Sequence, residues 1–161
     1  ELFMFKKCIF VFVALLSLTA CNADEVTETN SKVELEALLD NYRGKVIYLD
    51  FWASWCGPCR QSFPWMNEMQ RKHSPQGFTV VSVNLDANKS LATKFLEDSP
   101  AEFDIVYDAK GKIAKHFAIK GMPSSMMIGR DGEIKSTHTG FYLNKTTAYE
   151  KEIEALLLLK Q

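Results

Sequence analysis

Two cysteines separated by two residues, Cys56 and Cys59, lie where an apolar run gives way to an amphipathic one. A thiolate at the start of a helix is stabilised by the helix dipole and by unpaired backbone N–H groups, which can lower the pKa of a cysteine thiol from about 8.5 to roughly 3.5–7.5. The spacing also lets the two sulfurs close a short disulfide. Pro58 suits the first helical turn, where its missing N–H costs nothing, and Gly57 leaves Cys56 uncovered. The motif therefore predicts that Cys56 attacks and Cys59 resolves.

The segments around the cysteines predict a chain of alternating strands and helices. The continuous run 45–51, rich in β-branched and aromatic residues, is typical of a central strand, and 59–73 has the periodicity of an amphipathic helix with Pro64 inside it. A capping box at Ser31 predicts an earlier helix. Further strands are predicted at 78–85, 103–107, 125–128 and 133–139, and further helices at 87–98, at 111–118 and after a cap at Asn144. This order predicts an α/β domain with a mixed sheet and helices on both faces.

The string Asp50-Phe51-Trp52-Ala53, followed by Trp55-Cys56-Gly57-Pro58-Cys59, resembles the active-site segment of thioredoxins. From about residue 31 onward the chain resembles the exported TlpA/ResA-like branch of that superfamily. The resemblance implies a thioredoxin fold in which the helix–strand pair over 87–107 is the central insert of that branch. It also implies a thiol–disulfide oxidoreductase that needs no metal or organic cofactor, because a redox-active disulfide between the two cysteines does the chemistry.

The resemblance implies roles for residues outside the cysteine pair. Pro123 matches a proline that is cis in the superfamily and faces the active-site pair, so the backbone of Met122 would bind an extended substrate chain by strand addition. Trp55 would shield the pair and contact partners, whereas Trp52 fits a place in the core. The alternative for Pro123 is an ordinary proline at the start of a strand.

Asp50 lies on the strand that enters the site, where thioredoxins have a buried acid. Burial raises the pKa of a carboxylate, so Asp50 could exchange a proton with Cys59 through water. The alternative is a carboxylate satisfied by backbone donors. The sequence differs from the family pattern at two positions. Ser62 stands where many TlpA/ResA-like proteins have Glu, and Ser82 stands where thioredoxins have Lys.

The first residues resemble an export signal rather than a part of the fold. A basic Phe5-Lys6-Lys7 precedes the apolar run 8–16, which is too short to span a membrane. Leu18-Thr19-Ala20-Cys21 resembles the lipobox of bacterial lipoproteins, which implies cleavage before Cys21 and lipidation of that residue. The alternative is an ordinary signal peptide in which Cys21 is incidental. The predicted organisation is a lipoprotein signal peptide at 1–20, a flexible tether at 21–30 and a thioredoxin-like domain at 31–161.

Composition excludes several classes of function. The 161 residues carry a formal net charge of −1 without a basic block, so binding to nucleic acid is not expected. With Cys8 in the signal and Cys21 lipidated, one close pair remains, which favours redox chemistry over a structural disulfide framework. Zinc requires four ligands, and no second cysteine pair or paired histidine motif is present: the histidines are His73, His116 and His138. No metal site is therefore predicted.

These features predict a monomeric, lipid-anchored oxidoreductase of the cell envelope. Gly57 and Pro58 between the cysteines resemble reducing thioredoxins, so the expected reaction is the reduction of disulfides in protein substrates. A membrane thiol carrier is then needed as electron donor. Two alternatives remain: a binding or chaperone module in which the cysteines hold copper or haem-related cargo, and a peroxide-reducing relative on the same fold. The second lacks the Pro/Thr-flanked peroxidatic cysteine expected of that class.

Replacing Cys21 tests the predicted anchor. The Cys21→Ser change removes the only thiol that the lipobox would lipidate, so the protein is expected to leave the membrane fraction while its redox chemistry is unchanged. Incorporation of labelled fatty acid, together with membrane fractionation, measures the effect. A wild-type protein that takes up no fatty acid would show that Cys21 carries no lipid.

Overall fold

The structure, a computed structural model, describes residues 33–159. The predicted signal, the tether, Cys21 and the capping residue Ser31 lie outside the described residues, so the structure does not test these predictions. The described part begins with a helix over 33–41, which buries Leu35 as its apolar spacing predicts. Within the described part, no helix has both the length and the apolar composition needed to cross a membrane.

The described residues form a five-stranded mixed sheet in the order β3-β2-β1-β4-β5. β1 pairs in parallel with β2 and antiparallel with β4, β2 pairs in parallel with β3, and β4 pairs antiparallel with β5. The strands are β1 (Val46–Trp52), β2 (Phe78–Asn84), β3 (Asp104–Tyr107), β4 (Ser124–Ile128) and β5 (Ile134–Thr139). The mixed sheet predicted from the order of elements is confirmed.

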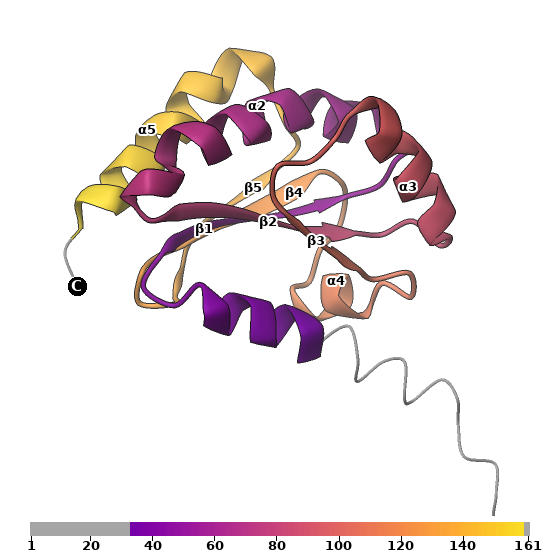
Figure 1. Ribbon diagram of the computed structural model, residues 1–161, viewed down its shortest axis with the longest axis horizontal. Helices are drawn as coiled ribbons and strands as arrows, with labels where there is room; N and C mark the ends of the chain where they lie inside the picture. The colour runs from indigo at the N-terminus through magenta and orange to yellow at the C-terminus, as the bar shows by residue number, and fades with distance from the viewer. Residues whose placement is uncertain (1–32, 160–161) are drawn as a thin grey trace, which may run out of the picture.

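Helices cover both faces of this sheet. The helices are α2 (Gly57–His73), α3 (Lys89–Asp98), α4 (Lys112–His116) and α5 (Thr146–Leu158), with short 3₁₀ turns at Ser74–Gln76 and Leu143–Lys145. In Figure 1, α2, α3 and α5 lie on one side of the strands, and the helix over 33–41 lies with α4 on the other. The predicted three-layer arrangement is therefore present, including the α3–β3 insert.

Local signals explain where most elements begin and end. α2 starts at Gly57, two residues earlier than predicted, because Cys56 serves as its N-cap and Pro58 occupies its first turn. α3 starts at Lys89 because the Asn88 side chain accepts a hydrogen bond from the Ser90 N–H. The tight turn between β4 and β5 is closed by a hydrogen bond from the Gly132 N–H to the Gly129 carbonyl, and the positive φ of Gly132 suits glycine.

The predicted cap at Asn144 is wrong. Asn144 lies inside the 3₁₀ turn, and α5 begins at Thr146 after Lys145, whose side chain makes no capping bond. The Thr146 hydroxyl donates to the Leu143 carbonyl, so the 3₁₀ turn runs directly into the helix. A helix entered through such a turn has fewer free N–H groups, which removes the need for a side-chain cap.

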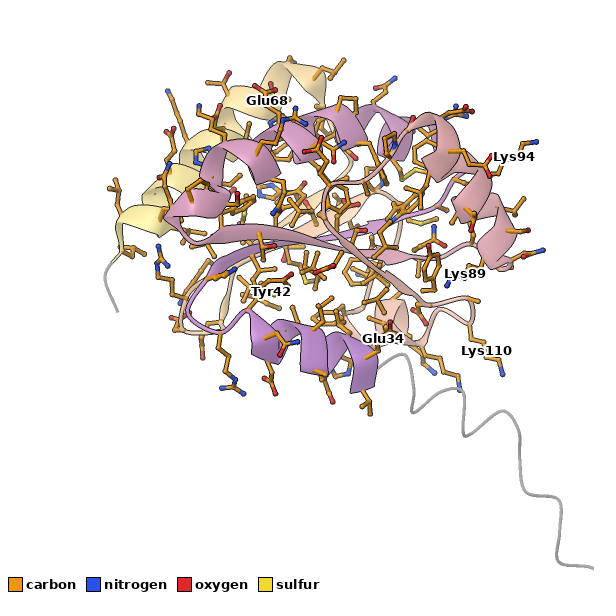
Figure 2. The ribbon with its side chains drawn as sticks, in the orientation of Figure 1. Glu34, Tyr42, Glu68, Lys89, Lys94 and Lys110 are labelled. Atoms are coloured by element: carbon orange, nitrogen blue, oxygen red, sulfur yellow. A yellow bond between two sulfur atoms is a disulfide. The ribbon has the colours of Figure 1, made fainter. Side chains whose placement is uncertain are left out.

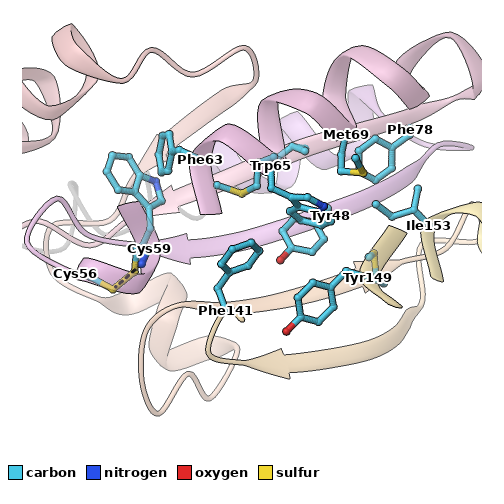
Figure 3. Packing of buried hydrophobic residues seen from close by; sticks show 14 of the residues in the cluster. Tyr48, Cys56, Cys59, Phe63, Trp65, Met69, Phe78, Phe141, Tyr149 and Ile153 are labelled. Carbon is cyan, nitrogen blue, oxygen red and sulfur yellow. Dashed lines mark hydrogen bonds between the residues drawn. A yellow bond between two sulfur atoms is a disulfide. The ribbon is translucent and has the colours of Figure 1, made fainter. Parts of the chain in front are cut away.

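A dense aromatic core lies between the sheet and the helices α2, α3 and α5. Phe63 of α2 packs against Trp52 and Phe95 with ring centroids 4.6 and 4.9 Å away. Figure 3 shows this layer running from Cys56 and Cys59 at one end to Phe78 and Ile153 at the other. The opposite face of the sheet has a separate aliphatic core beneath the helix over 33–41 and α4. Charged side chains such as Glu68, Lys94 and Lys110 project outward (Figure 2).

Truncation of the central phenylalanine tests how far the fold depends on this core. Phe63 is 1% exposed, so Phe63→Ala leaves a cavity and is expected to lower the free energy of unfolding by about 3–5 kcal/mol. Leu91→Ala on α3 is the matched control, because Leu91 is 48% exposed and its loss should change stability by about 0.5 kcal/mol or less. Urea titration measures both. Equal losses in the two variants would contradict the packing described.

Candidate active site

The two cysteines lie at the start of α2 and are joined in a disulfide. Cys56 is the N-cap residue, and its Sγ accepts a hydrogen bond from the Cys59 N–H at 3.3 Å. Cys56 is 6% exposed and Cys59 is fully buried, which makes Cys56 the less deeply buried of the two. A Cβ on Gly57 would meet no atom within 4 Å, so the space beside the pair is open. Of the two cysteines, Cys56 is therefore the one that a partner sulfur can approach more readily.

The three tryptophans divide between the core and the surface. Trp52 is fully buried, and its Nε1 donates to the Ser82 hydroxyl at 3.2 Å. Trp65 of α2 is 7% exposed and packs edge-on against Tyr48. Trp55, directly before Cys56, is 68% exposed. An indole held in solvent beside a redox-active sulfur offers a large amphipathic contact surface.

Pro123 lies at the same end of the sheet as the disulfide. The Met122–Pro123 peptide bond is cis, and Pro123 immediately precedes β4. The antiparallel register pairs Phe51 with Ser124, so Pro123 falls opposite Trp52, where the chain leaves β1 towards Cys56. Met122 packs against the cluster that contains both cysteines. The register therefore places Met122 and Pro123 at the end of the sheet from which the cysteine loop leaves.

Asp50 is buried in the middle of the sheet, with one carboxyl oxygen that has no hydrogen-bond partner. It is 1% exposed, and its Oδ2 makes no hydrogen bond. Burial raises the pKa of Asp50 to about 8. Its neighbours in the register are Ser82 on β2 and Ser125 on β4, neither of which carries a charge. The alternative of a carboxylate satisfied by backbone donors is therefore excluded for Oδ2.

The two serines that replace residues of the family pattern, Ser62 and Ser82, both form hydrogen bonds within the protein. Ser62 is 1% exposed, and its hydroxyl donates to the Cys59 carbonyl at 2.8 Å. Ser82 is fully buried and accepts the Trp52 indole N–H at 3.2 Å. Neither serine can act as an acid or a base near neutral pH. Asp50 is consequently the carboxyl group that β1 places in the buried core.

Phe141 also belongs to the hydrophobic cluster that contains the cysteines. It is 6% exposed and packs against Trp65 and Tyr149 with ring centroids 5.7 and 5.9 Å away. Figure 3 shows Phe141 on the cysteine side of Tyr149. The Gly140 N–H donates to the Pro123 carbonyl at 2.8 Å, which holds the Phe141 loop against the cis-proline segment. No local pattern marks this residue, because its neighbours come from distant parts of the chain.

One group of described side chains has potential metal ligands close together, and it lies away from the cysteines. Atoms of His73, Glu150 and Glu154 fall within 4.8 Å of one another. Lys72 Nζ already lies 2.5 Å from Glu150 Oε1, and His73 Nε2 lies 3.2 Å from the same oxygen. Because an ammonium competes with a cation for the carboxylate, this group is an ion-pair cluster at the far end of α2.

The buried carboxyl group makes stability depend on pH. Since burial keeps Asp50 protonated up to about pH 8 while the unfolded chain ionises near pH 3.9, wild-type stability falls as the pH rises through this window. Asp50→Asn removes the ionisable group and keeps the shape. With the disulfide intact, the variant's advantage in free energy of unfolding is expected to grow from pH 4 to pH 8 and then level off. Urea titrations at pH 4, 6, 8 and 9 measure it.

Asp98→Asn provides the control, because Asp98 is an exposed acid at the end of α3. Its effect on stability should vary far less with pH than that of Asp50→Asn. A constant difference between wild type and Asp50→Asn across the whole range would show that Asp50 ionises freely in the folded protein.

Comparisons with known proteins agree with this geometry. A family model described as Redoxin matches residues 17–157. The thiol-disulfide oxidoreductase ResA of Geobacillus kaustophilus is 34% identical over 105 residues, which cover 65% of this chain and 60% of the relative. ResA of Bacillus subtilis is 29% identical over 114 residues, or 70% of this chain and 62% of the relative. The chain thus spans about 60% of the length of the curated relatives that it matches.

Solved structures give the same result for the fold. A protein from Chlorobium tepidum, described as a thiol:disulfide interchange protein DsbE, matches with a TM-score of 0.73 and 52% identity over 74% of this chain and 84% of its own. StoA of Bacillus subtilis matches with a TM-score of 0.60 and 30% identity, over 70% of this chain and 84% of its own. The thioredoxin fold and the expected likeness to ResA are confirmed. The chain belongs to the Redoxin family of the thioredoxin superfamily.

Proposed function

We propose that this protein is a thiol–disulfide oxidoreductase of the cell envelope that reduces disulfide bonds in other proteins. The observation that carries the proposal is the Cys56–Cys59 disulfide at the start of α2, in which Cys56 is less deeply buried than Cys59. The curated relatives named ResA are thiol-disulfide oxidoreductases, and the DsbE neighbour is described as a thiol:disulfide interchange protein. These names support the same reaction for this chain.

The reaction begins with the reduced cysteine pair. The Cys56 thiolate, stabilised by the N-terminus of α2, attacks one sulfur of a partner's disulfide. A new bond forms between Cys56 and that sulfur, while the second sulfur of the partner leaves as a thiolate and takes up a proton. The product is a mixed disulfide between the two proteins. Trp55 and the backbone of Met122 provide the contact surface for the partner chain.

The second step releases the reduced partner. Cys59 loses its proton and attacks Cys56 Sγ, which forms the disulfide seen here and expels the partner's remaining sulfur as a thiolate. Two electrons have then passed from the cysteine pair to the partner. The ionised fraction of Asp50 is proposed to accept the Cys59 proton, through water. Its raised pKa of about 8 lies close to that of a free thiol, so the transfer is nearly balanced in energy.

The cycle requires a reductant that restores the two thiols. In an oxidising compartment this reductant is proposed to be a membrane thiol carrier, because the soluble surroundings would not supply electrons. Membrane attachment through lipid on Cys21 would keep the protein near that carrier. The lipobox-like string before Cys21 supports this location. The protein is proposed to act as a monomer through small, transient redox interfaces.

Cysteine variants test the mechanism directly. Wild type is expected to reduce insulin disulfides when dithiothreitol recharges it, and Cys56→Ser is expected to lose this activity because no attacking thiolate remains. Cys59→Ser removes the resolving thiol, so mixed disulfides should accumulate and can be identified by mass spectrometry after non-reducing electrophoresis.

Cys56→Ser is also the matched control for trapping, because it keeps only the more deeply buried thiol of the pair. Adducts on Cys59 in that variant, at the level seen on Cys56 in Cys59→Ser, would reverse the two roles. A wild-type protein that binds copper or haem tightly and reduces no disulfide would favour the binding-module alternative instead.

A further inference from the structure

A carboxylate from a neighbouring loop holds the segment that leads into the cysteine pair. Asp86 follows β2 by two residues and is 1% exposed. Its Oδ2 accepts the Ser54 backbone N–H at 2.9 Å, and its Oδ1 accepts the Ser54 hydroxyl at 2.9 Å. Both hydrogen-bond donors of Ser54, its backbone N–H and its hydroxyl, therefore bind the Asp86 carboxylate. Ser54 lies in the loop between β1 and α2, two residues before Cys56.

Asp86 is itself held rigidly by the end of β2. Asn84, fully buried at the last position of that strand, donates from Nδ2 to Asp86 Oδ2 at 2.8 Å. The Asp86 N–H in turn donates to Asn84 Oδ1 at 3.2 Å. Between them, the Leu85 N–H donates to the Trp52 carbonyl at 2.8 Å. Charge-assisted bonds of this kind are strong, and together they offset the cost of burying the carboxylate.

The position of Cys56 depends on the backbone that this network fixes. Cys56 closes a turn through its N–H to the Ala53 carbonyl at 3.1 Å, so the loop between the Ser54 anchor and α2 is short and tight. As N-cap, Cys56 has an extended backbone, with φ −82° and ψ 106°, that aims its Sγ at the Cys59 N–H. A sulfur aimed at free N–H groups is where the helix N-terminus stabilises a thiolate.

We propose that Asp86 is a positioning residue for the redox pair: by anchoring Ser54, it holds Cys56 in the N-cap conformation that stabilises the attacking thiolate. The role of that thiolate in disulfide exchange rests on the proposed function. The network also leaves Trp55, between Ser54 and Cys56, turned out into solvent. Asp86 touches neither sulfur and takes no part in the electron transfer.

The sign of the effect distinguishes positioning from simple electrostatics. If Asp86 acted only through its negative charge, removing it would make the Cys56 thiolate easier to form. If Asp86 acts by holding the loop, removing it lets Cys56 leave the helix N-terminus and makes the thiolate harder to form. The two roles therefore shift the reactivity of Cys56 in opposite directions.

Two variants separate these effects in the full chain. Asp86→Asn removes the charge and one of the two acceptor oxygens. Ser54→Ala removes the bond from the hydroxyl but keeps the charge of Asp86 and the bond from the backbone. Alkylation of the reduced protein by iodoacetamide is followed across pH 4–9, with mass spectrometry on the peptide that contains Cys56.

Both variants are expected to shift the midpoint of this alkylation profile to higher pH. The shift should be about 0.3 to 1 pH unit for Asp86→Asn, as expected for partial loss of the interaction with the helix N-terminus, and smaller for Ser54→Ala. The reduction potential, measured by equilibration with glutathione, should become more negative in the same order, because the reduced form loses stabilisation.

Asp108→Asn is the matched control for loss of stability. Asp108 is another buried carboxylate directly after a strand, 2% exposed, and it accepts the N–H groups of Lys112 and Ala114 at 2.9 and 3.0 Å. These bonds hold the start of α4 rather than the loop before Cys56. Asp108→Asn should therefore lower the thermal midpoint while leaving the alkylation profile of Cys56 at its wild-type position.

Three results would overturn the proposal. The first is an alkylation profile of Cys56 that stays at the wild-type position in folded Asp86→Asn and Ser54→Ala. The second is a shift of that profile to lower pH in Asp86→Asn. The third is a shift in Asp108→Asn as large as the shift in Asp86→Asn. If Asp86→Asn does not fold, Ser54→Ala decides alone, since it keeps the carboxylate and the backbone bond. None of these measurements needs a protein substrate. Failure of wild type to reduce insulin would thus refute the proposed function and leave the positioning result standing.

Discussion

The structure depends on the complete burial of β1. All seven of its residues are buried, because β2 and β4 pair with its edges while helices cover both of its faces. Alternate side chains enter different cores: Trp52 points into the aromatic layer beneath α2, and Phe51 into the aliphatic layer on the other side. Two neighbouring strands and two layers of helices hold β1 in one position. The loop that carries the cysteines begins at the carboxyl end of this strand, so its starting point is also fixed.

The register of β1 assembles the rest of the site. Pairing with β4 puts the cis Met122–Pro123 bond opposite the end of β1, and pairing with β2 brings the Asn84–Asp86 segment beside the loop that follows. The same pairing surrounds Asp50 with uncharged side chains. A one-residue slip would turn Asp50 to the other face of the sheet. The hydrophobic burial that fixes the register therefore also fixes the chemistry of the site.

Two buried carboxylates near the cysteine pair have opposite environments. Asp86 has three hydrogen-bond donors on its two oxygens, while Asp50 has an oxygen with none. A carboxylate with every acceptor bonded is suited to holding backbone in place. A carboxyl group that burial leaves partly unsatisfied is suited to exchanging a proton, because a pKa of about 8 leaves both of its charge states populated near neutral pH. One fold thus places two identical functional groups in different roles.

The sequence by itself determined those features that depend on residues close together along the chain. Hydrophobic periodicity predicted the strands and helices to within one or two residues, and the spacing of Cys56 and Cys59 predicted their disulfide, because these signals are local. The start of α5 was missed because a 3₁₀ turn, rather than an Asn144 cap, leads into that helix. Only the tertiary structure decided the partners of Ser54, the packing of Phe141 beside the cysteines, and the lack of a charged neighbour for Asp50. Such contacts join segments that are far apart in sequence, so only the register of the sheet and the packing of helices on its faces bring them together.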